Sequence, residues 1–257
     1  MLVTPAARAL QAVRISAMAV GRSMAGAWAG GPRRASGRRG RVGGMKIIVT
    51  CGPSYEPIDE VRRITNFSTG ELGSRLARAL ARAGHAVTCF KGVAATTKEN
   101  AEPARTVTFT TNDDLAAQLH ALPDRAEIGA VFHAAALADF KIEWARDGQR
   151  KISSRAGAVT LTLVPSSKVI RELRALFPQA RLVGWKYELD GTREDALAKA
   201  KWQLADNHTD VCVINGIAYG RGFGVCPAGR APEHHADSAA LCAWAVEWLA
   251  DRIARPA

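Results

Sequence analysis

From Met45 onward, short apolar runs alternate with segments of helical periodicity. The first run, Lys46–Cys51, predicts a buried strand, and Glu71–Ala83 predicts a helix because its leucines recur on one face. The alternation continues, with strands predicted at Ala86–Phe90, Thr106–Phe109, Ile128–His133, Val159–Val164, Arg181–Trp185 and Val211–Asn215, and helices at Asp113–Leu122, Ser167–Leu176, Glu194–Asp206 and Ala236–Ile253. Such alternation predicts a three-layer α/β fold, in which a mainly parallel sheet has helices on both faces.

The segments between these elements differ in character. Gly52–Gly70 and Gly216–His235 predict long loops, and the polar, irregular stretch Leu137–Arg155 predicts an extension that serves as a flap or dimerisation element. In parallel sheets, ligands bind beyond the C-terminal ends of the strands, near the point where the strand order reverses. The loops that follow the first, fourth and last predicted strands are therefore expected to converge on one site.

The net charge of +11 is unevenly distributed. Residues 1–44 hold eight arginines and no Asp, Glu or Lys, so removing them leaves +3 for residues 45–257. This composition predicts a disordered leader; it resembles an organellar transit peptide and lacks the apolar core of a secretory signal. Because Met45 directly precedes the first predicted strand, an upstream start that is not used in the cell is the other explanation. Residues 45–257 are expected to form one domain.

These arginines are also the one feature that favours nucleic acid as a partner, and the nearly balanced charge of the rest argues against it. No stretch approaches 18 consecutive apolar residues, so no membrane-spanning helix is expected. The five cysteines are widely spaced and form no CxxC pair, which argues against a disulfide framework and a zinc site. A reducing compartment, and hence a cytoplasmic location, is the simple inference.

Two motifs are candidates for binding chemistry. In the run from Asn66 to Gly73, small residues precede a helix, whose free N–H groups and dipole would hold phosphate; the alternative is an ordinary helix start with no ligand. No Walker A or G-x-G-x-x-G motif occurs. In the run from Ala134 to Asp139, alanines at a strand end would let a ligand approach the backbone. Asp139 could bind a polar substrate group or a metal ion, or be a solvated carboxylate.

Three further side chains are candidates, each with a structural alternative. Lys151, expected on the flap, could neutralise phosphate charge during a reaction, or be a solvated lysine. Arg62 suits bidentate recognition of carboxylate or phosphate, or is a surface arginine. Trp185 could stack on a nucleobase, or pack in the core. The histidines, His133, His208, His234 and His235 among them, lack metal-binding spacing and are expected to be structural.

Taken together, these segments resemble the phosphopantothenoylcysteine synthetase (phosphopantothenate–cysteine ligase) family. The matching runs appear in the family's order and cover nearly all of residues 45–257; they are Val49–Asp59, Val61–Gly70, His133–Phe140, Lys151–Ser154, Val183–Glu188 and Val213–Asn215. The resemblance implies a Rossmann-like fold and a homodimer. It also implies an acid–amino-acid ligase of coenzyme A synthesis, which uses ATP or CTP with Mg²⁺ to activate 4′-phosphopantothenate as an acyl-nucleotidylate before cysteine attacks.

The resemblance also implies roles for individual residues. Nucleotide contacts are expected from Gly52, Ser68, Gly70, Gly73, Asp139, Lys151, Trp185 and Asn215. Phosphopantothenate contacts are expected from Ala135, Ala136, Asp139, Asn66 and, across a dimer interface, Arg62. Asn66 would assist the second half-reaction and Lys151 would stabilise charge in the first. The flavin-dependent partner domain is not recognised in this sequence, so no FMN is expected.

The sequence departs from the family at three positions. Glu71 stands where bacterial members often carry Lys, and two lysines of cytidine recognition fall at Gln203 and Asn207. The runs containing Lys151 and Trp185 look closer to the ATP-using type. These departures keep a second hypothesis open, a degenerate paralogue that only binds nucleotide or phosphopantothenate. A short-chain reductase is a remote third, because Tyr187 has Gly191 where that class needs Lys.

Overall fold

The computed structural model describes residues 44–143, 151–153, 155 and 157–253. They belong to one compact unit, Gly40–Ala257. The leader predicted for residues 1–44 therefore lies outside the described residues, apart from Gly44.

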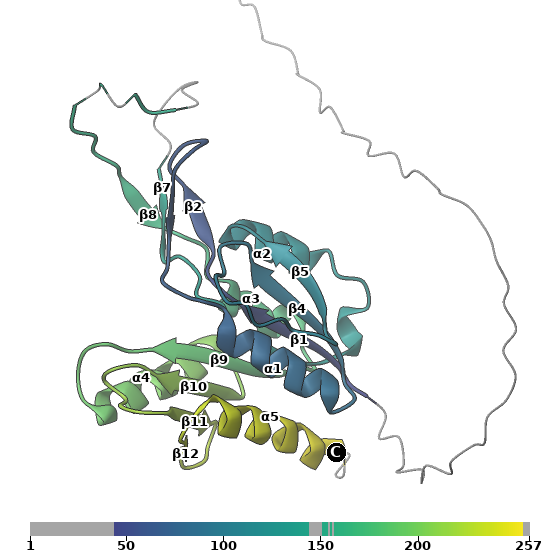
Figure 1. The fold of residues 1–257 in the computed structure, drawn as a ribbon. Coiled ribbons are helices and arrows are strands. Elements are labelled where there is room, and N and C mark those ends of the chain that lie inside the picture. The colour runs from purple at the N-terminus through teal and green to yellow at the C-terminus, as the bar shows by residue number, and fades with distance from the viewer. Residues whose placement is uncertain (1–43, 144–150, 154, 156, 254–257) are drawn as a thin grey trace, which may run out of the picture. The chain divides into compact units, whose positions relative to one another are not determined.

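The predicted three-layer architecture is confirmed. Eight strands form one sheet in the order β12-β11-β10-β9-β6-β1-β4-β5 (Figure 1). The six from β10 to β5 run parallel, β11 is antiparallel to β10, and β12 is antiparallel to β11. Their bounds are β1 Lys46–Cys51, β4 Ala86–Gly92, β5 Arg105–Phe109, β6 Ile128–His133, β9 Arg181–Tyr187, β10 Val211–Asn215, β11 Phe223–Pro227 and β12 Glu233–His235.

Helices cover both faces of this sheet. Alternate residues of β1 point to opposite sides, so Ile47 and Val49 pack beneath α1 (Glu71–Arg82) and α5 (Ser238–Ile253), which lie side by side (Figure 1). Ile48 packs in the core on the other face. That face is covered by α2 Asn112–His120, α3 Val169–Leu176 and α4 Arg193–Asn207. Among the described residues no helix is long and apolar enough to cross a membrane.

Two predicted loops were wrong. Gly216–His235 contains β11 and β12, where glycines hid a strand pattern whose Val225 and Cys226 are buried. Gly224 is required there, because a Cβ atom would lie 2.6 Å from the ring of Tyr219. Gly52–Gly70 contains the antiparallel pair β2 (Tyr55–Pro57) and β3 (Arg63–Thr65).

The predicted extension is a second ribbon. β7 (Phe140–Ile142) pairs with β8 (Leu163–Pro165), so the strand predicted over Val159–Val164 is confirmed only at its end, since residues 159–162 are not strand. The β2–β3 and β7–β8 ribbons stand together beyond the sheet, beside its C-terminal edge (Figure 1). The two ribbons thus form one wall of the space over the ends of β1 and β6.

Candidate functional site

The strand order reverses between β1 and β6. The chain proceeds from β1 to β4 and β5, then crosses back to place β6 on the other side of β1. Beyond the strand ends the two following loops continue to pair: Ala136 N–H donates to Gly52 O at 2.9 Å, and Ser54 N–H donates to Ala136 O at 3.3 Å. A doubly wound sheet binds its ligand at such a switch point, so the ligand crevice is expected above these two joined loops.

The N-terminus of α1 opens onto this crevice. Gly70 caps the helix with a left-handed φ of 76° and without a side-chain bond. The Glu71 N–H donates to Thr69 Oγ1 at 3.3 Å, so the N–H groups of Leu72 and Gly73 are the ones open to an anion. A Cβ atom at Gly73 would lie 2.2 Å from the Cβ atom of Cys51, so only glycine lets α1 approach β1 this closely. Gly52, also left-handed at 76°, and Ser68 complete the predicted phosphate loop.

Glu71 does not leave an isolated negative charge beside this loop. Its carboxylate lies 2.6 Å from the Arg75 guanidinium, one helical turn away. Arg75 also contacts Glu99. The hydrogen bond from Arg78, followed by the positive charges of Arg78 and Arg75, holds the pKa of Glu99 below its usual value. The first two turns of α1 thus carry a half-buried network of paired charges.

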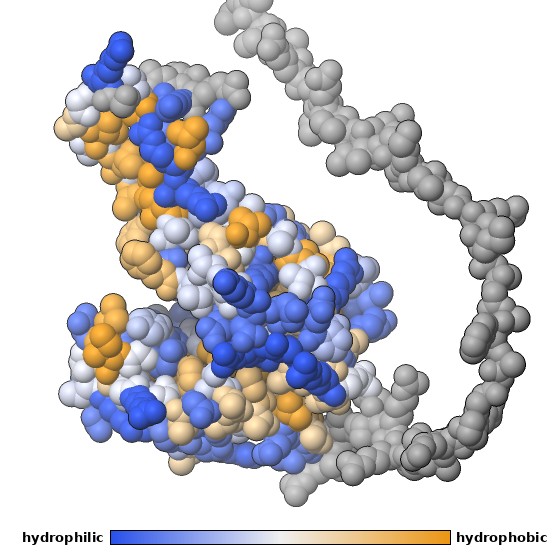
Figure 2. Space-filling view, viewed as in Figure 1, coloured by the Kyte–Doolittle hydropathy of each residue, from blue (hydrophilic) through white to orange (hydrophobic). Residues whose placement is uncertain are grey.

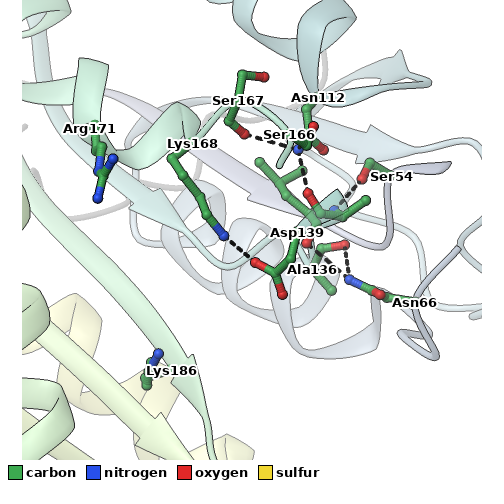
Figure 3. A network of polar contacts seen from close by, with 12 residues as sticks. Ser54, Asn66, Asn112, Ala136, Asp139, Ser166, Ser167, Lys168, Arg171 and Lys186 are labelled. Carbon is green, nitrogen blue, oxygen red and sulfur yellow. Dashed lines mark hydrogen bonds and ion pairs between the residues drawn. The ribbon is translucent and has the colours of Figure 1, made fainter. Parts of the chain in front are cut away.

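Asn66 ties the first loop to the second. Its side-chain amide donates to the backbone oxygens of Ala136, at 3.2 Å, and Leu137, at 3.0 Å (Figure 3). The side chain is exposed, so it borders the crevice instead of supporting it from below. Asn66, Ala135 and Ala136 are therefore brought together as the sequence predicted.

Buried polar groups beneath the second loop were missed from the sequence. Ser54 Oγ accepts the N–H of Ala138 at 2.8 Å, and the Asn112 amide donates to Ala138 O at 2.8 Å and to Ser166 Oγ at 3.0 Å (Figure 3). Glu56 is buried nearby, and burial raises the pKa of its carboxyl. No local pattern identifies these groups, because each partner is 26 or more positions away.

Asp139 stands at the mouth of the crevice. Its exposed carboxylate forms an ion pair with Lys168, which precedes α3; Arg171 and Lys186 are labelled in the same view, on the Lys168 side (Figure 3). Carboxylate oxygen suits Mg²⁺, which is usually held by one or two carboxylates together with substrate phosphates. No group of three or more metal-binding side chains occurs among the described residues, so Asp139 is at most one ligand.

Asn215 is the last residue of β10, and Trp185 lies two residues before the end of the neighbouring strand β9. Trp185 is half-buried and packs against the core beneath α1 and α5, and its indole N–H has no hydrogen-bond partner among the described residues. Asn215 pairs in register with Tyr187. Both positions thus lie at the ligand-binding edge of the sheet.

Gln203 and Asn207 have structural contacts instead. Gln203 donates to Trp185 O at 3.1 Å and accepts from the Cys212 thiol at 2.7 Å, while the buried Asn207 donates to Gln203 O at 2.9 Å. Both amides are thus engaged within the chain.

Arg62 contacts Ile152, the residue that follows Lys151. Arg62 donates to the backbone oxygen of Ile152 at 2.6 Å and lies 3.3 Å from the Asp59 carboxylate. Asp59 in turn accepts the N–H of Ile152 at 3.1 Å, so the turn between β2 and β3 is hydrogen-bonded to the residue that follows Lys151. Within this one chain Arg62 therefore has a partner other than substrate. Arg150 and Ser154 of the predicted flap lie outside the described residues.

Comparison with known proteins agrees with this architecture. Residues 42–227 match the family described as DNA/pantothenate metabolism flavoprotein C-terminal domain. A solved DNA/pantothenate metabolism flavoprotein from Streptococcus pneumoniae shares the fold with a TM-score of 0.71 at 23% identity, over 80% of this chain and 99% of that one.

Two curated relatives are each 30% identical to this chain. One is the coenzyme A biosynthesis bifunctional protein CoaBC of Bacillus subtilis, matched over 70% of this chain and 43% of its own length. The other is a cysteine/cysteine sulfinic acid decarboxylase from an unknown prokaryotic organism, matched over 71% of this chain and 49% of its own length. The chain thus spans less than half of either relative. The matched family nevertheless covers most of the chain, which therefore belongs to the DNA/pantothenate metabolism flavoprotein C-terminal domain family.

Proposed function

We propose that this chain is a phosphopantothenate–cysteine ligase of coenzyme A biosynthesis. Family membership and the coenzyme A function named for the Bacillus relative support the proposal. The observation that carries it is the placement of Asn66, whose amide bridges to the alanine loop at Ala136 only four residues before the helix cap Gly70. A carboxylate substrate on that loop would thus lie beside a triphosphate at the N-terminus of α1.

The first step solves a leaving-group problem, because a carboxylate is inert to amines until it is activated. An oxygen of the substrate carboxylate attacks the α-phosphorus of the nucleotide, and the bond to pyrophosphate breaks. Gly52, Gly70 and Gly73 would offer backbone N–H groups to the phosphates, and Lys151 would offset the charge that develops. Ser68 would add its hydroxyl, because its own N–H donates to Asn66 O at 2.9 Å. Trp185 and Asn215 would line the end of the site that holds the base.

In the second step the cysteine amine attacks the activated carbonyl carbon, the nucleoside monophosphate leaves, and the nitrogen loses a proton. Asn66 is the group we assign to this step, because its amide stands at the loop that would hold the acyl group. Ala135, Ala136 and Asp139 would contact phosphopantothenate, and Arg62 its phosphate. Positioning of this kind is a large part of catalysis in group transfer.

Mg²⁺ would reach the site with the triphosphate, held mainly by phosphate oxygens and by Asp139 once its contact with Lys168 opens. Bound there, the ion would neutralise phosphate charge. ATP is the nucleotide we favour, since Gln203 and Asn207 are engaged within the chain. The five buried, unpaired cysteines are consistent with a cytoplasmic location.

We propose a homodimer formed through the ribbons. Phe140 and Leu163 are about half exposed on β7 and β8, Val61 is exposed on the turn between β2 and β3, and Figure 2 shows hydrophobic surface along this arm. Exposed apolar surface of this kind marks interaction sites. A second copy of the chain would cover this apolar surface. Its turn between β2 and β3, which carries Arg62, would then come toward the crevice of the first copy.

The test is pyrophosphate release by the full chain, supplied with 4′-phosphopantothenate, Mg²⁺ and either ATP or CTP, followed by addition of L-cysteine. We expect release that depends on phosphopantothenate, and product only after cysteine is added. Lys151→Ala should slow release, whereas Glu127→Gln, which alters a surface ion pair with Lys46 at the opposite end of the sheet, should not. A folded protein that releases no pyrophosphate with either nucleotide would contradict the proposal.

A degenerate binding paralogue is the second candidate, and Glu71 is the observation that favours it. The charge of Glu71 is paired with Arg75, which reduces but does not abolish the repulsion that it would exert on a bound triphosphate. Calorimetric binding of phosphopantothenate and nucleotide without turnover would support this candidate over the ligase.

A further inference from the structure

We propose that Asp59 is a positioning residue that sets the location of Lys151 by fixing the backbone of Ile152. The clamp itself is read from the geometry, whereas its importance for Lys151 rests on the proposed ligase function. No sequence feature assigns Asp59 a role, because it lies 93 positions from the residue that it holds.

The two carboxylate oxygens of Asp59 have separate tasks. Oδ1 accepts the backbone N–H groups of Val61 at 2.9 Å and Arg62 at 2.8 Å, which caps the turn between β2 and β3. Oδ2 accepts the N–H of Ile152 at 3.1 Å and lies 3.3 Å from the Arg62 guanidinium. One oxygen thus shapes the turn and the other reaches across to the flap.

Arg62 holds the same residue from its other side, since its guanidinium donates to Ile152 O at 2.6 Å. Both backbone polar groups of Ile152 are therefore bound by one turn, and the Ile152 side chain is itself buried, with 5% of its surface exposed. Two hydrogen bonds to one residue fix both the direction of the chain at Ile152 and its distance from the turn between β2 and β3.

These contacts of Asp59 and Arg62 are suited to hold the backbone of Lys151 in place. The Asp59 side chain is 1% exposed, so its charge requires the N–H donors and the guanidinium that surround it. Burial alone would raise the pKa of Asp59, but the N–H groups of Ile152, Val61 and Arg62, together with the charge of Arg62, lower it below its usual value. Lys151 precedes the clamped residue directly, so its Cα lies about 3.8 Å from that of Ile152. Its exposed side chain can move, but its backbone cannot move far.

Asp59→Asn in the full chain separates the two tasks. The amide oxygen can keep the two turn bonds, whereas the amide NH₂ replaces Oδ2 and faces the Ile152 N–H with another donor. Hydrogen–deuterium exchange at residues 151–153 should then accelerate by about tenfold or more, while exchange in β1 and β6 stays unchanged. Glu127→Gln is the matched control and should leave both regions as in the wild type. Unchanged protection of Ile152 in Asp59→Asn would overturn the clamp.

If Asp59→Asn does not fold, Asp59→Ser supplies the same exchange test, because a serine hydroxyl can cap the turn N–H groups but has no second oxygen for the Ile152 N–H. Faster exchange at 151–153 alone supports the clamp, and wild-type exchange overturns it. The exchange readout needs no activity, so it decides the clamp even if the ligase proposal fails.

Pyrophosphate release then tests whether the clamp acts through Lys151. We expect Asp59→Asn to lower kcat by roughly tenfold, and the double variant with Lys151→Ala to be no slower than Lys151→Ala alone. If the two losses instead multiply, Asp59 acts independently of Lys151 and the positioning role is wrong.

Discussion

The Thr50 hydroxyl lies 2.9 Å from Nδ1 of His133, and it also accepts the backbone N–H of Ala135 at 3.3 Å. A hydroxyl has one donor and two lone pairs, so Thr50 can still donate to Nδ1 or accept from it, and the tautomer of His133 sets the direction. Both side chains are buried at the ends of β1 and β6. The pair therefore joins the two strands directly beneath the crevice.

Stability should fall as this histidine is protonated. Burial lowers the pKa of His133 from 6.5 to about 4. Above pH 6.5 His133 is unprotonated in both the folded and the unfolded chain, so the free energy of unfolding has its full value. Between pH 6.5 and 4 only the unfolded chain takes up the proton, which destabilises the fold by roughly 2–3 kcal/mol in total. Urea unfolding at pH 7.5, 6 and 5 measures this loss. His133→Gln should show a flatter dependence; parallel curves would refute the assignment.

Asn66→Ala should separate the two half-reactions. Without the amide, we expect the acyl-nucleotide to accumulate while phosphopantothenoylcysteine forms about 10²-fold more slowly, because the residue is assigned to the second step. Quenched-flow chromatography of both species provides the measurement. Asn100→Ala, an exposed asparagine in the loop before β5, is the matched control. Product formation at the wild-type rate would show that Asn66 does not serve this step.

Replacing Glu71 should change nucleotide affinity in graded steps. Glu71→Gln removes a negative charge beside the phosphate loop and Glu71→Lys reverses it, so the KM for the triphosphate should fall by about threefold and tenfold respectively. The KM for cysteine should not change. Glu194→Lys, in the exposed first turn of α4, is the control. A KM that is the same in all three proteins would mean that Glu71 is remote from the bound phosphates.

Gly73→Ala should be costly for stability. Its Cβ atom would be placed 2.2 Å from that of Cys51, and neither α1 nor β1 can retreat without disturbing the core. We expect a loss of about 1–3 kcal/mol in urea unfolding. Gly184→Ala is the comparison, because its Cβ atom meets the flexible Ile170 Cδ1 at 3.0 Å and should cost less. Equal losses would show that α1 is not fixed at this contact.

Charges on the ribbons should dissociate the proposed dimer. Phe140→Glu or Leu163→Glu would bury an unpaired carboxylate in the interface, so the protein should sediment as a monomer and lose activity together with dimerisation. Trp202→Glu changes an equally exposed aromatic residue on α4 and should leave the dimer intact. Sedimentation velocity distinguishes the outcomes; a wild-type monomer would exclude this assembly.

Local patterns were enough to predict most of the fold. The helix α1 and the strand β1 follow from the periodicity of leucines and from an apolar run, which neighbouring residues decide. The glycines expected to hold phosphate came from the small residues before α1 and from the family resemblance, whereas the left-handed φ of Gly70 is a finding of the structure. Strands with interrupted patterns were not identified, as β11 illustrates.

The contacts that complete the site were decided by tertiary structure alone. Asn66 meets Leu137 across 71 positions, Thr50 meets His133 across 83, and Asp59 meets Ile152 across 93. Such partners depend on which strands become neighbours, and the crossover that places β6 beside β1 sets that order. The sequence by itself therefore determined the elements and the residue types at their ends. Only the folded sheet decided which ends face one another, because hydrogen bonds depend on distance in space and not on separation along the chain.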